Sequence, residues 1–433
     1  VELLEPYYRY ISSLQQDRLC NMHILYLHQY FCPPDGAGGT RSYEIARRLI
    51  KRGHKVTMIT SSAFFPDNYK FKTKDSMSLN GIQLLVCNVK YNNSMSFARR
   101  IIAFIEFIFK SIILTFKTKN TDLVFATSTP LTIIIPGFII SRIRNNPLIF
   151  EVRDLWPELP IAIGAIKNPI LKFLTTKLEK FAYLKAKNII ALSPGMKRSI
   201  EQRGINKSKI YTIPNGCDVE LFQNKNSINI DEIITDHEII SKPIVLYAGT
   251  FGTINDLNYI IELAYESLKL GYKINFLLCG DGLEKNYIIS RAKKTNTLGV
   301  NLWVLDSIPK SSMPTLMNIA TVSISVFKNI TEMQNNSANK FFDAIASGKP
   351  VIINYEGWQA QLIESSGIGL VLPYKDKRKA IIKLNKFINS KKRLSYAQFK
   401  TQQLSEGKFN RERQFSKLVS ILEDSISTDN CYD

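Results

Sequence analysis

The sequence lacks the usual marks of a secreted, disulfide-bonded or membrane-spanning protein. Its six cysteines are scattered, with no CxxC pair and no metal-ligand spacing, so we interpret them as reduced, partly buried thiols. The first residues lack the basic-then-apolar order of a signal peptide. No uncharged apolar run approaches the ~20 residues that a membrane-spanning helix needs. These absences favour a cytoplasmic protein.

Two binding signatures are missing as well. The first predicted strand is not followed directly by GxGxxG, which argues against a dehydrogenase. Basic residues are not interleaved with aromatic ones as in nucleic-acid-binding modules, so no nucleic acid is expected as a partner. What the chain does have is length. Its 433 residues exceed the ~250–300 at which a single core stops growing, so two domains are expected.

The charge is strongly positive and unevenly spread. The net charge is +20, and residues 1–200 hold 28 Lys and Arg against 13 Asp and Glu, which leaves 29 against 24 for the rest. The basic first half indicates an anionic partner such as a phosphorylated lipid or a membrane surface. The alternative is that the surplus lysine is only solvated surface.

Strand and helix patterns alternate along the chain, as a parallel α/β domain requires. The first half begins with a strand over 24–27, a glycine-rich loop at 35–40, a helix over 41–52 and a strand over 54–60. Further strands are predicted at 82–88, 123–126, 148–152 and 188–192. The second half repeats the theme with a strand over 244–247, a loop at 249–252, a helix over 257–270 and a strand over 274–279. The sequence therefore predicts two doubly wound, Rossmann-like domains in tandem.

These patterns divide the chain into four parts. Met22 resembles a natural start, so residues 1–21 are interpreted as a poorly packed N-terminal extension. The first domain is placed at 22–223 and the second at 224–409, with the boundary in the polar stretch before Pro243. Residues 410–433 are expected to form a C-terminal helix and tail. Two arrangements fit the sequence: this part packs back onto the first domain, or it stays with the second.

Two apolar segments bear on membrane contact. Residues 97–119 are aromatic and aliphatic on most turns but carry charges such as Arg99, Glu106 and Lys110, which is typical of a helix lying in the headgroup region of a bilayer. The alternative is a core helix packed on the sheet. The shorter segment 131–143 is predicted to be a buried helix.

The chemistry is expected at loops that follow strands, where open α/β sheets bind their ligands. Glycines let backbone N–H groups approach an anion, and a following helix offers its positive end. The first loop is predicted to face the acceptor or a diphosphate, and its residues are Gly36, Gly38, Gly39 and Thr40. Two loops of the second half are predicted to bind the donor. The first consists of Gly249, Thr250, Phe251 and Gly252, and the second of Gly280, Asp281 and Gly282. Alone, such a loop is often only a tight turn.

Three further candidates follow the predicted strand over 148–152. Arg153 and Asp154 can form a structural ion pair with each other. The alternative that we adopt is that both face the cleft between the domains and bind a hydroxyl or phosphate of the acceptor. Trp156 would then form an apolar wall.

The segment 335–350 has the pattern of a helix that ends at a glycine and runs into a buried strand. Lys340 and Asp343 are three residues apart, so both can face one ligand. Lys340 is predicted to neutralise a leaving diphosphate, and Asp343 to accept hydrogen bonds from sugar or ribose hydroxyls. The polar residues around them are predicted to contact the donor as well: Asn335, Asn336, Ser337 and Asn339. The alternative is an ordinary helix start with a surface Lys/Asp pair.

Taken in order, these motifs resemble glycosyltransferase family 4, retaining enzymes of the GT-B architecture with two Rossmann-like domains facing across a cleft. The resemblance rests on the glycine-rich first loop, SPGMK, IPNGCD, YAGTFG, CGDG and NKFFDAIASGKPVI, and covers about residues 22–422. The stretches HQYFCPPDGAGGTR and EVRDLWPE resemble the branch that builds bacterial O-antigen, capsule and colanic-acid repeats, which includes N-acetyl-L-fucosamine transferases.

The resemblance implies transfer without a metal or cofactor, from a nucleotide-diphosphate sugar on the second domain to an acceptor on the first. Asp343 stands where the family's second acidic residue contacts ribose. Asn335 stands eight residues earlier, where the family has Glu, so a covalent glycosyl-enzyme is disfavoured there and the leaving diphosphate is expected to accept the acceptor's proton. Residues 252–255 are uncharged where the family has Arg and Lys. Lys340 is therefore expected to carry more of the phosphate load.

The expected function is transfer of a sugar, with N-acetyl-L-fucosamine or a related amino or deoxy sugar as the candidate, from a UDP-linked donor to a polyprenyl-diphosphate-linked glycan in O-antigen or capsule assembly. Lys340, Arg153 and Asp154 are the predicted catalytic residues. The enzyme is expected to be peripheral, on the anionic inner face of the bacterial plasma membrane. Two alternatives are a nucleotide-sugar epimerase of the same fold and a basic membrane- or RNA-binding protein without catalysis.

Overall fold

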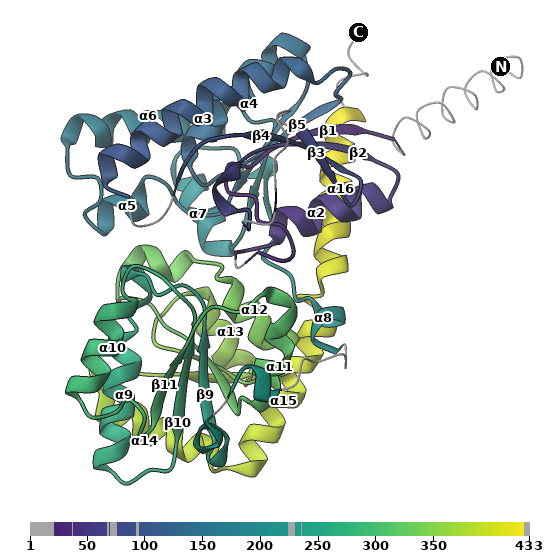
Figure 1. The fold of residues 1–433 in the computed structure, drawn as a ribbon. Coiled ribbons are helices and arrows are strands. Elements are labelled where there is room, and N and C mark those ends of the chain that lie inside the picture. The colour runs from purple at the N-terminus through teal and green to yellow at the C-terminus, as the bar shows by residue number, and fades with distance from the viewer. Residues whose placement is uncertain are drawn as a thin grey trace, which may run out of the picture. The chain divides into compact units, whose positions relative to one another are not determined.

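The computed structural model describes residues 21–36, 38–66, 69, 76–91, 95–223, 230–234 and 236–427. The chain divides into two compact units (Figure 1). Unit 1 consists of Val1–Leu192, Met196–Ile213 and Phe415–Asp433, and unit 2 of Ser193–Gly195 and Pro214–Gln414. The predicted extension at 1–21 lies, except for Asn21, outside the described residues.

Unit 1 is built on an eight-stranded sheet in the order β3-β4-β2-β1-β5-β6-β7-β8, in which only the β3–β4 pair is antiparallel. Every residue of β1, β5 and β6 is buried, because helices cover both faces of the sheet. The strands are β1 His23–Leu27, β2 Lys55–Ser61, β3 Ser76–Leu79, β4 Ile82–Cys87, β5 Leu123–Thr127, β6 Leu148–Val152, β7 Asn188–Ala191 and β8 Ile210–Thr212.

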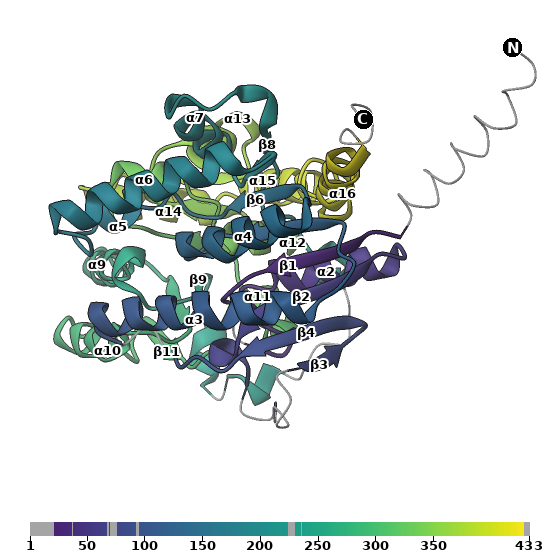
Figure 2. The ribbon, with the colours of Figure 1, turned by 90° about the horizontal axis from the view of Figure 1, so that it is seen from above.

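The helices of unit 1 form two layers, with α3, α4 and α6 on one face of the sheet and α2 and α16 on the other (Figures 1 and 2). Side chains of β1 alternate between the two cores: Leu25 and Leu27 pack with the first group, and Ile24 and Tyr26 with the second. The helices are α2 Arg41–Lys51, α3 Phe97–Lys117, α4 Ile134–Arg144, α5 Glu158–Ala162, α6 Pro169–Lys185, α7 Pro194–Gln202 and α16 Arg411–Ser427, with 3-10 turns η1 Ser62–Phe64, η2 Leu131–Ile133 and η3 Lys207–Lys209.

Unit 2 has an all-parallel, six-stranded sheet in the order β11-β10-β9-β12-β13-β14. Its strands are β9 Ile244–Ala248, β10 Asn275–Cys279, β11 Leu302–Leu305, β12 Val322–Ser325, β13 Val351–Ile353 and β14 Gly369–Val371. Its helices are α8 Val219–Gln223, α9 Asn258–Lys269, α10 Lys285–Lys294, α11 Met313–Ile319, α12 Asn339–Ala346, α13 Trp358–Ser366, α14 Lys377–Ile388 and α15 Lys391–Glu406. The 3-10 turns are η4 Ile230–Glu232, η5 His237–Ser241, η6 Thr253–Asn255, η7 Lys310–Ser312 and η8 Thr331–Asn335.

The predicted fold of two parallel, Rossmann-like α/β domains is confirmed, and the predicted strands end within two residues of the observed ones. Two parts of the predicted first domain, 22–223, belong to unit 2 instead. One is the stretch 214–223, which includes α8, and the other is Ser193–Gly195. For Ser193–Gly195 the reason is a long-range contact: the Ser193 hydroxyl donates to the Asn335 carbonyl oxygen at 2.6 Å.

The segment predicted as either an interfacial or a core helix is α3, and it has features of both. Ala103, Phe107 and Leu114 are buried in the core of unit 1. The opposite side of the helix exposes large apolar side chains, namely Ile102, Ile105, Phe109, Ile113 and Phe116. No helix within the described residues has both the length and the apolarity to cross a bilayer. The second apolar segment forms η2 and α4, and it is buried along its sheet-facing side through Ile134 and Ile140.

Candidate functional site

The carboxyl ends of β9 and β10 lead into two glycine loops that are joined backbone to backbone. The Gly249 amide donates to the Cys279 carbonyl oxygen at 2.9 Å, and the Phe251 amide to the Asp281 carbonyl oxygen at 2.8 Å. A Cβ atom added to Gly280 would lie 1.9 Å from the Gly249 carbonyl oxygen, and Gly280 has φ +155°. Glycine is therefore required at position 280 by this close approach.

These bonds change which groups of the loop at 249–252 can bind a ligand. All four backbone amides were expected to be available to a diphosphate, but those of Gly249 and Phe251 are already used. Within the described residues, the amides of Thr250 and Gly252 make no hydrogen bond. The side chain of Asp281 is exposed and accepts a hydrogen bond from the Gly282 amide at 2.8 Å.

Lys340, in the first turn of α12, reaches this loop. Its Nζ donates to the Tyr247 hydroxyl and to Asn255 Oδ1, both at 2.8 Å, and lies 4.3 Å from the centre of the Tyr247 ring. Tyr247 and Asn255 both donate in turn to the Thr250 carbonyl oxygen. Burial lowers the pKa of the Lys340 ammonium to about 7, because its partners are neutral and do not replace the lost hydration.

Asp343 lies one turn further along α12 and has a different partner. Its Oδ2 is 2.5 Å from Nζ of Lys310, which belongs to η7. Lys340 and Asp343 were expected to face one ligand. In the structure Lys340 lies at the loop after β9, whereas Asp343 forms an ion pair with Lys310. Nothing in the sequence pattern marks Lys310 apart from its charge, since Lys310 and Asp343 are 33 residues apart.

The polar residues before α12 mostly shape the chain. Asn336 donates to the Met333 carbonyl oxygen and accepts from the Ala338 amide, so its carboxamide is used within its own turn. The Asn335 side chain packs against Gly195, where an added Cβ atom would lie 1.9 Å from Asn335 Oδ1.

The two remaining residues of this stretch keep free side-chain polar groups. The Ser337 hydroxyl is buried and has no hydrogen-bond partner in the described part of the chain. Asn339 is exposed at the start of α12. Ser337 and Asn339 therefore stay predicted donor contacts, whereas Asn336 is a turn-forming residue.

In unit 1, the residues after β6 bind neighbouring strand ends and do not bind each other. Arg153 lies 3.2 Å from His28 Nε2, and Thr129 donates to Asp154 Oδ2 at 2.9 Å. Burial, and next the positive charge of Arg153, hold the pKa of His28 well below its usual range. His28 is therefore neutral and its Nε2 accepts from the guanidinium. The alternative of an Arg153–Asp154 ion pair is wrong. Trp156 is partly buried against the core of unit 1.

A buried ion pair at the same strand ends was missed from the sequence. Arg41, the first residue of α2, donates from Nε to Glu151 Oε1 at 2.9 Å and from a terminal nitrogen to the Ile213 carbonyl oxygen at 3.2 Å. The Glu151 side chain is fully buried and also accepts from the Thr127 hydroxyl at 3.1 Å. The signal was a single acid inside the otherwise apolar strand LIFEV.

The glycine-rich first loop wraps a thiol. Cβ atoms added to Gly36 and Gly38 would lie 2.5 and 2.9 Å from the Cys32 sulfur, and the Gly38 amide donates to that sulfur at 3.2 Å. Thr40, which follows Gly39, is buried, and its carbonyl oxygen accepts the Glu44 amide of α2. Packing on Cys32 thus accounts for two of the glycines. A ligand role of this loop stays a prediction.

Comparison with protein families shows the kind of enzyme to which the chain belongs. The model of the family described as Glycosyltransferase Family 4 matches residues 38–221, and the model described as Glycosyl transferases group 1 matches residues 229–403. The chain is a glycosyltransferase. The descriptions of both families favour transfer over the epimerase and the non-catalytic binding protein. A protein from Listeria monocytogenes that is described as a UDP-N-acetylglucosamine 2-epimerase shares the fold, with a TM-score of 0.60 at 8% identity, covering 94% of this chain and 97% of that one. No curated protein matches the chain significantly.

Solved structures resemble this glycosyltransferase over nearly its whole length. Sucrose-phosphate synthase from Thermosynechococcus elongatus has a TM-score of 0.71 at 16% identity, covering 94% of this chain and 100% of that one. HepE from Anabaena, in complex with UDP and glucose, has a TM-score of 0.66 at 16% identity, covering 93% and 100%. WaaG, a glycosyltransferase involved in lipopolysaccharide biosynthesis, has a TM-score of 0.64 at 14% identity, covering 92% and 99%. These likenesses establish the GT-B fold.

Proposed function

We propose that this glycosyltransferase moves a sugar, with retention of anomeric configuration, from a nucleotide-diphosphate donor on unit 2 to a hydroxyl of an acceptor on unit 1. The observation that carries the proposal is the position of Lys340. Its ammonium lies at the loop after β9, among neutral partners, beside two backbone amides without partners. A cation in such surroundings is stabilised by an anion that comes to it.

A diphosphate is the anion that fits this loop. Its oxygens accept hydrogen bonds from the Thr250 and Gly252 amides, while Lys340 supplies the opposing charge. Because burial lowers the pKa of Lys340 to about 7, a dianionic ligand raises that pKa again and favours the charged form. Asp343, ion-paired with Lys310, is proposed to accept the ribose hydroxyls. HepE binds UDP and glucose, and UDP is the nucleotide that we propose.

The transfer itself is proposed to need no protein nucleophile. Asn335 has no carboxylate, and its carboxamide packs on Gly195. The diphosphate oxygen released from the sugar is on the same face as the incoming hydroxyl and accepts its proton. Arg153 and Asp154, each held by a partner from another strand end, are proposed to bind and orient the acceptor.

The acceptor is proposed to be a polyprenyl-diphosphate-linked glycan, presented at the anionic inner face of a bacterial plasma membrane. The exposed apolar row on α3 supports this, and α3, α4 and α6 lie along the same face of the sheet (Figure 2). Helix α6 adds exposed apolar and basic side chains, namely Ile170, Phe173, Leu174, Lys177 and Lys180. An apolar row flanked by cations is the arrangement of an interfacial helix. The similarity to WaaG supports a role in O-antigen or capsule assembly, with N-acetyl-L-fucosamine as the candidate sugar.

The membrane part has its own test, which is co-sedimentation with phosphatidylglycerol vesicles. The double variant Phe109→Ser/Ile113→Ser should lower binding about tenfold or more, because two apolar side chains no longer enter the interface. A matched control is Leu283→Ser, an equally exposed apolar residue of unit 2, which should bind as the parent does. Binding should also weaken with salt. Unchanged binding of the α3 variant would contradict this placement.

The experiment that tests the transfer incubates the enzyme with a panel of nucleotide sugars and membrane-extracted polyprenyl glycan, and reads the products by mass. The expected product is the glycan heavier by one sugar, together with one nucleoside diphosphate per transfer. Donor consumption that does not require the acceptor would contradict the proposal. So would activity that is unchanged when Lys340 is replaced by Met.

A further inference from the structure

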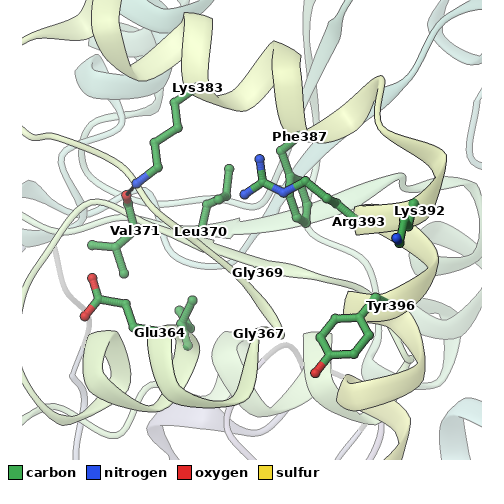
Figure 3. A pocket seen from close by; sticks show the side chains of 11 residues that line it. Glu364, Gly367, Gly369, Leu370, Val371, Lys383, Phe387, Lys392, Arg393 and Tyr396 are labelled. Atoms are coloured by element: carbon green, nitrogen blue, oxygen red, sulfur yellow. Dashed lines mark hydrogen bonds between the residues drawn. The ribbon is translucent and has the colours of Figure 1, made fainter.

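Unit 2 contains a pocket of about 510 Å³ at the far edge of its sheet (Figure 3). It runs along the outer edge of β14, is lined by residues of α13, α14 and α15, and is open to solvent. In the sheet order, β12 and β13 separate β14 from β9, so the pocket is separate from the loops proposed to bind the donor. Its size lies within the range of ~300–1,000 Å³ that is typical of small-molecule sites.

One wall of the pocket carries cations without counter-charges. Lys392 and Arg393 lie in the first turn of α15, which contains no acidic residue. Among the described residues, no carboxylate lies within ion-pair distance of either side chain. The Arg393 guanidinium lies 5.5 Å from the centre of the Phe387 ring and points into the pocket (Figure 3).

This placement favours an anion, although both side chains are also open to water. Cations at a helix N-terminus oppose the helix dipole, whereas anions there are stabilised by about 0.3–1 kcal/mol each. The surrounding sequence enhances the effect, since residues 375–400 contain ten Lys and Arg but only one acid, Asp376. This basic run at 375–400 is not evident from the net charge of the second half, because acidic residues elsewhere in that half offset it. A phosphate matches the fork of an arginine in two parallel hydrogen bonds.

The opposite wall limits what else the ligand can be. Glu364 of α13 faces the pocket from that side (Figure 3). Lys383 is held at β14 by donating to the Val371 carbonyl oxygen at 2.9 Å. The floor is apolar, formed by Leu370 and Phe387, and the Tyr396 ring stands at the rim. A carboxylate repels an extended polyanion and accepts hydrogen bonds from hydroxyl groups.

We propose that this pocket binds a small sugar phosphate, a phosphate monoester on a polyhydroxylated body. The phosphate lies on the Arg393 and Lys392 side chains, beside the first turn of α15, where the Ser390 hydroxyl caps the Arg393 amide. The hydroxyls donate to Glu364, and the C–H face of the ring rests on Leu370 and Tyr396. The inference does not depend on the proposed donor or acceptor, since it uses none of their residues.

The test is calorimetric titration of the full chain with three probes: glucose 6-phosphate, inorganic phosphate and glucose. Glucose 6-phosphate should bind most tightly, inorganic phosphate more weakly, and glucose not measurably. The double variant Lys392→Ala/Arg393→Ala should weaken glucose 6-phosphate about tenfold or more, because a hydrogen bond to a charged group contributes about 1.5–3 kcal/mol. Both side chains are exposed, and a thermal melt checks that the variant is folded.

A matched control is Lys379→Ala/Lys386→Ala, which removes the same charge from the same basic run outside the pocket. It should bind glucose 6-phosphate within about twofold of the parent, because distant charges are screened by salt. The variant Glu364→Gln should weaken glucose 6-phosphate yet leave inorganic phosphate bound as well or better. Equal weakening by both double variants, loss of binding on Lys340→Met, or binding only to phosphatidylglycerol vesicles would each overturn the proposal.

Discussion

The two units have the same kind of sheet but distribute charge differently at its carboxyl edge. In unit 1 Arg41 is paired with the buried Glu151 carboxylate, whereas Arg153 donates a hydrogen bond to the neutral His28. In unit 2 the cation at the loop after β9, Lys340, has only neutral partners. Arg41 thus has its counter-charge within the fold, whereas under the proposed function the counter-charge of Lys340 comes from the diphosphate of the donor.

The largest expected effect tests the internal matching of unit 1. Replacing Arg41 by Met leaves the fully buried Glu151 carboxylate without its cation, and such uncompensated charges cost about 3–5 kcal/mol of unfolding free energy. Denaturant unfolding of Arg41→Met and of a control, Arg47→Met, measures this. Arg47 of the same helix is partly exposed, and its partner Glu44 keeps a second ion pair with Arg48, so its loss should cost less than about 1 kcal/mol. Equal losses in the two variants would show that burial does not distinguish these ion pairs.

The next effect tests the unmatched cation of unit 2. Lys340→Met keeps most of the side-chain volume and removes the charge, so kcat/KM for the donor should fall about 100- to 1,000-fold, as when one electrostatic donor is lost. The unfolding free energy should not fall, since a poorly hydrated charge is removed. Lys349→Met, a control in which the lost lysine binds the Asn318 carbonyl oxygen at 3.1 Å, should keep donor turnover. Normal turnover by Lys340→Met would end the diphosphate assignment.

The pH dependence of donor binding follows from the same cation. Burial lowers the pKa of Lys340 to about 7. In the free enzyme the Lys340 side chain is therefore mostly neutral at pH 8 and mostly charged at pH 6. A diphosphate binds the charged form, so affinity should be nearly constant below pH 6 and fall about tenfold per pH unit above 7. Calorimetry at pH 8 in two buffers of different ionisation enthalpy should show uptake of close to one proton. Identical heats in both buffers, or the same uptake by Lys340→Met, would contradict this.

A smaller effect concerns an incompletely matched acid of unit 1. Burial raises the pKa of Glu179 to about 7, although Arg203 and the Tyr183 hydroxyl oppose the shift. Because the folded pKa is higher than the unfolded one, stability is fully present below pH 4.5 and is lost as pH rises through 7. Between pH 5 and 8 the unfolding free energy should fall by about 2 kcal/mol. Glu179→Gln should flatten that fall, and an equal slope in both proteins would contradict the assignment.

Much of the fold follows from local patterns. The apolar runs at β1, β6 and β9 place strands because every residue there is buried, and glycines at strand ends identify loops that only glycine can form. Strands of three residues such as β8 and β14 carry too little pattern to be detected. Their position is determined by pairing with strands that are distant in the sequence.

The site could be predicted in its residues but not in its contacts. Lys340 was identified from its place on an amphipathic helix start, yet its partners Tyr247 and Asn255 are 93 and 85 residues away. Only the sheet order brings them together. The local turn made by Asn336 has a short-range pattern typical of Asn, whereas the use of the Gly249 and Phe251 amides depends on how two loops meet.

Helix α16 has a consequence for how the protein is made. The last strand of the unit 1 sheet ends at Thr212, while α16 begins at Arg411, and Phe415, Leu418 and Leu422 of α16 complete the core over Ile24 and Tyr26. A ribosome therefore exposes an unfinished apolar sheet face until the whole of unit 2 has been translated. A fragment ending at residue 213 would keep α2 on that face but leave the part under α16 uncovered, and we expect it to aggregate. The part of the chain made first is the part whose folding finishes last.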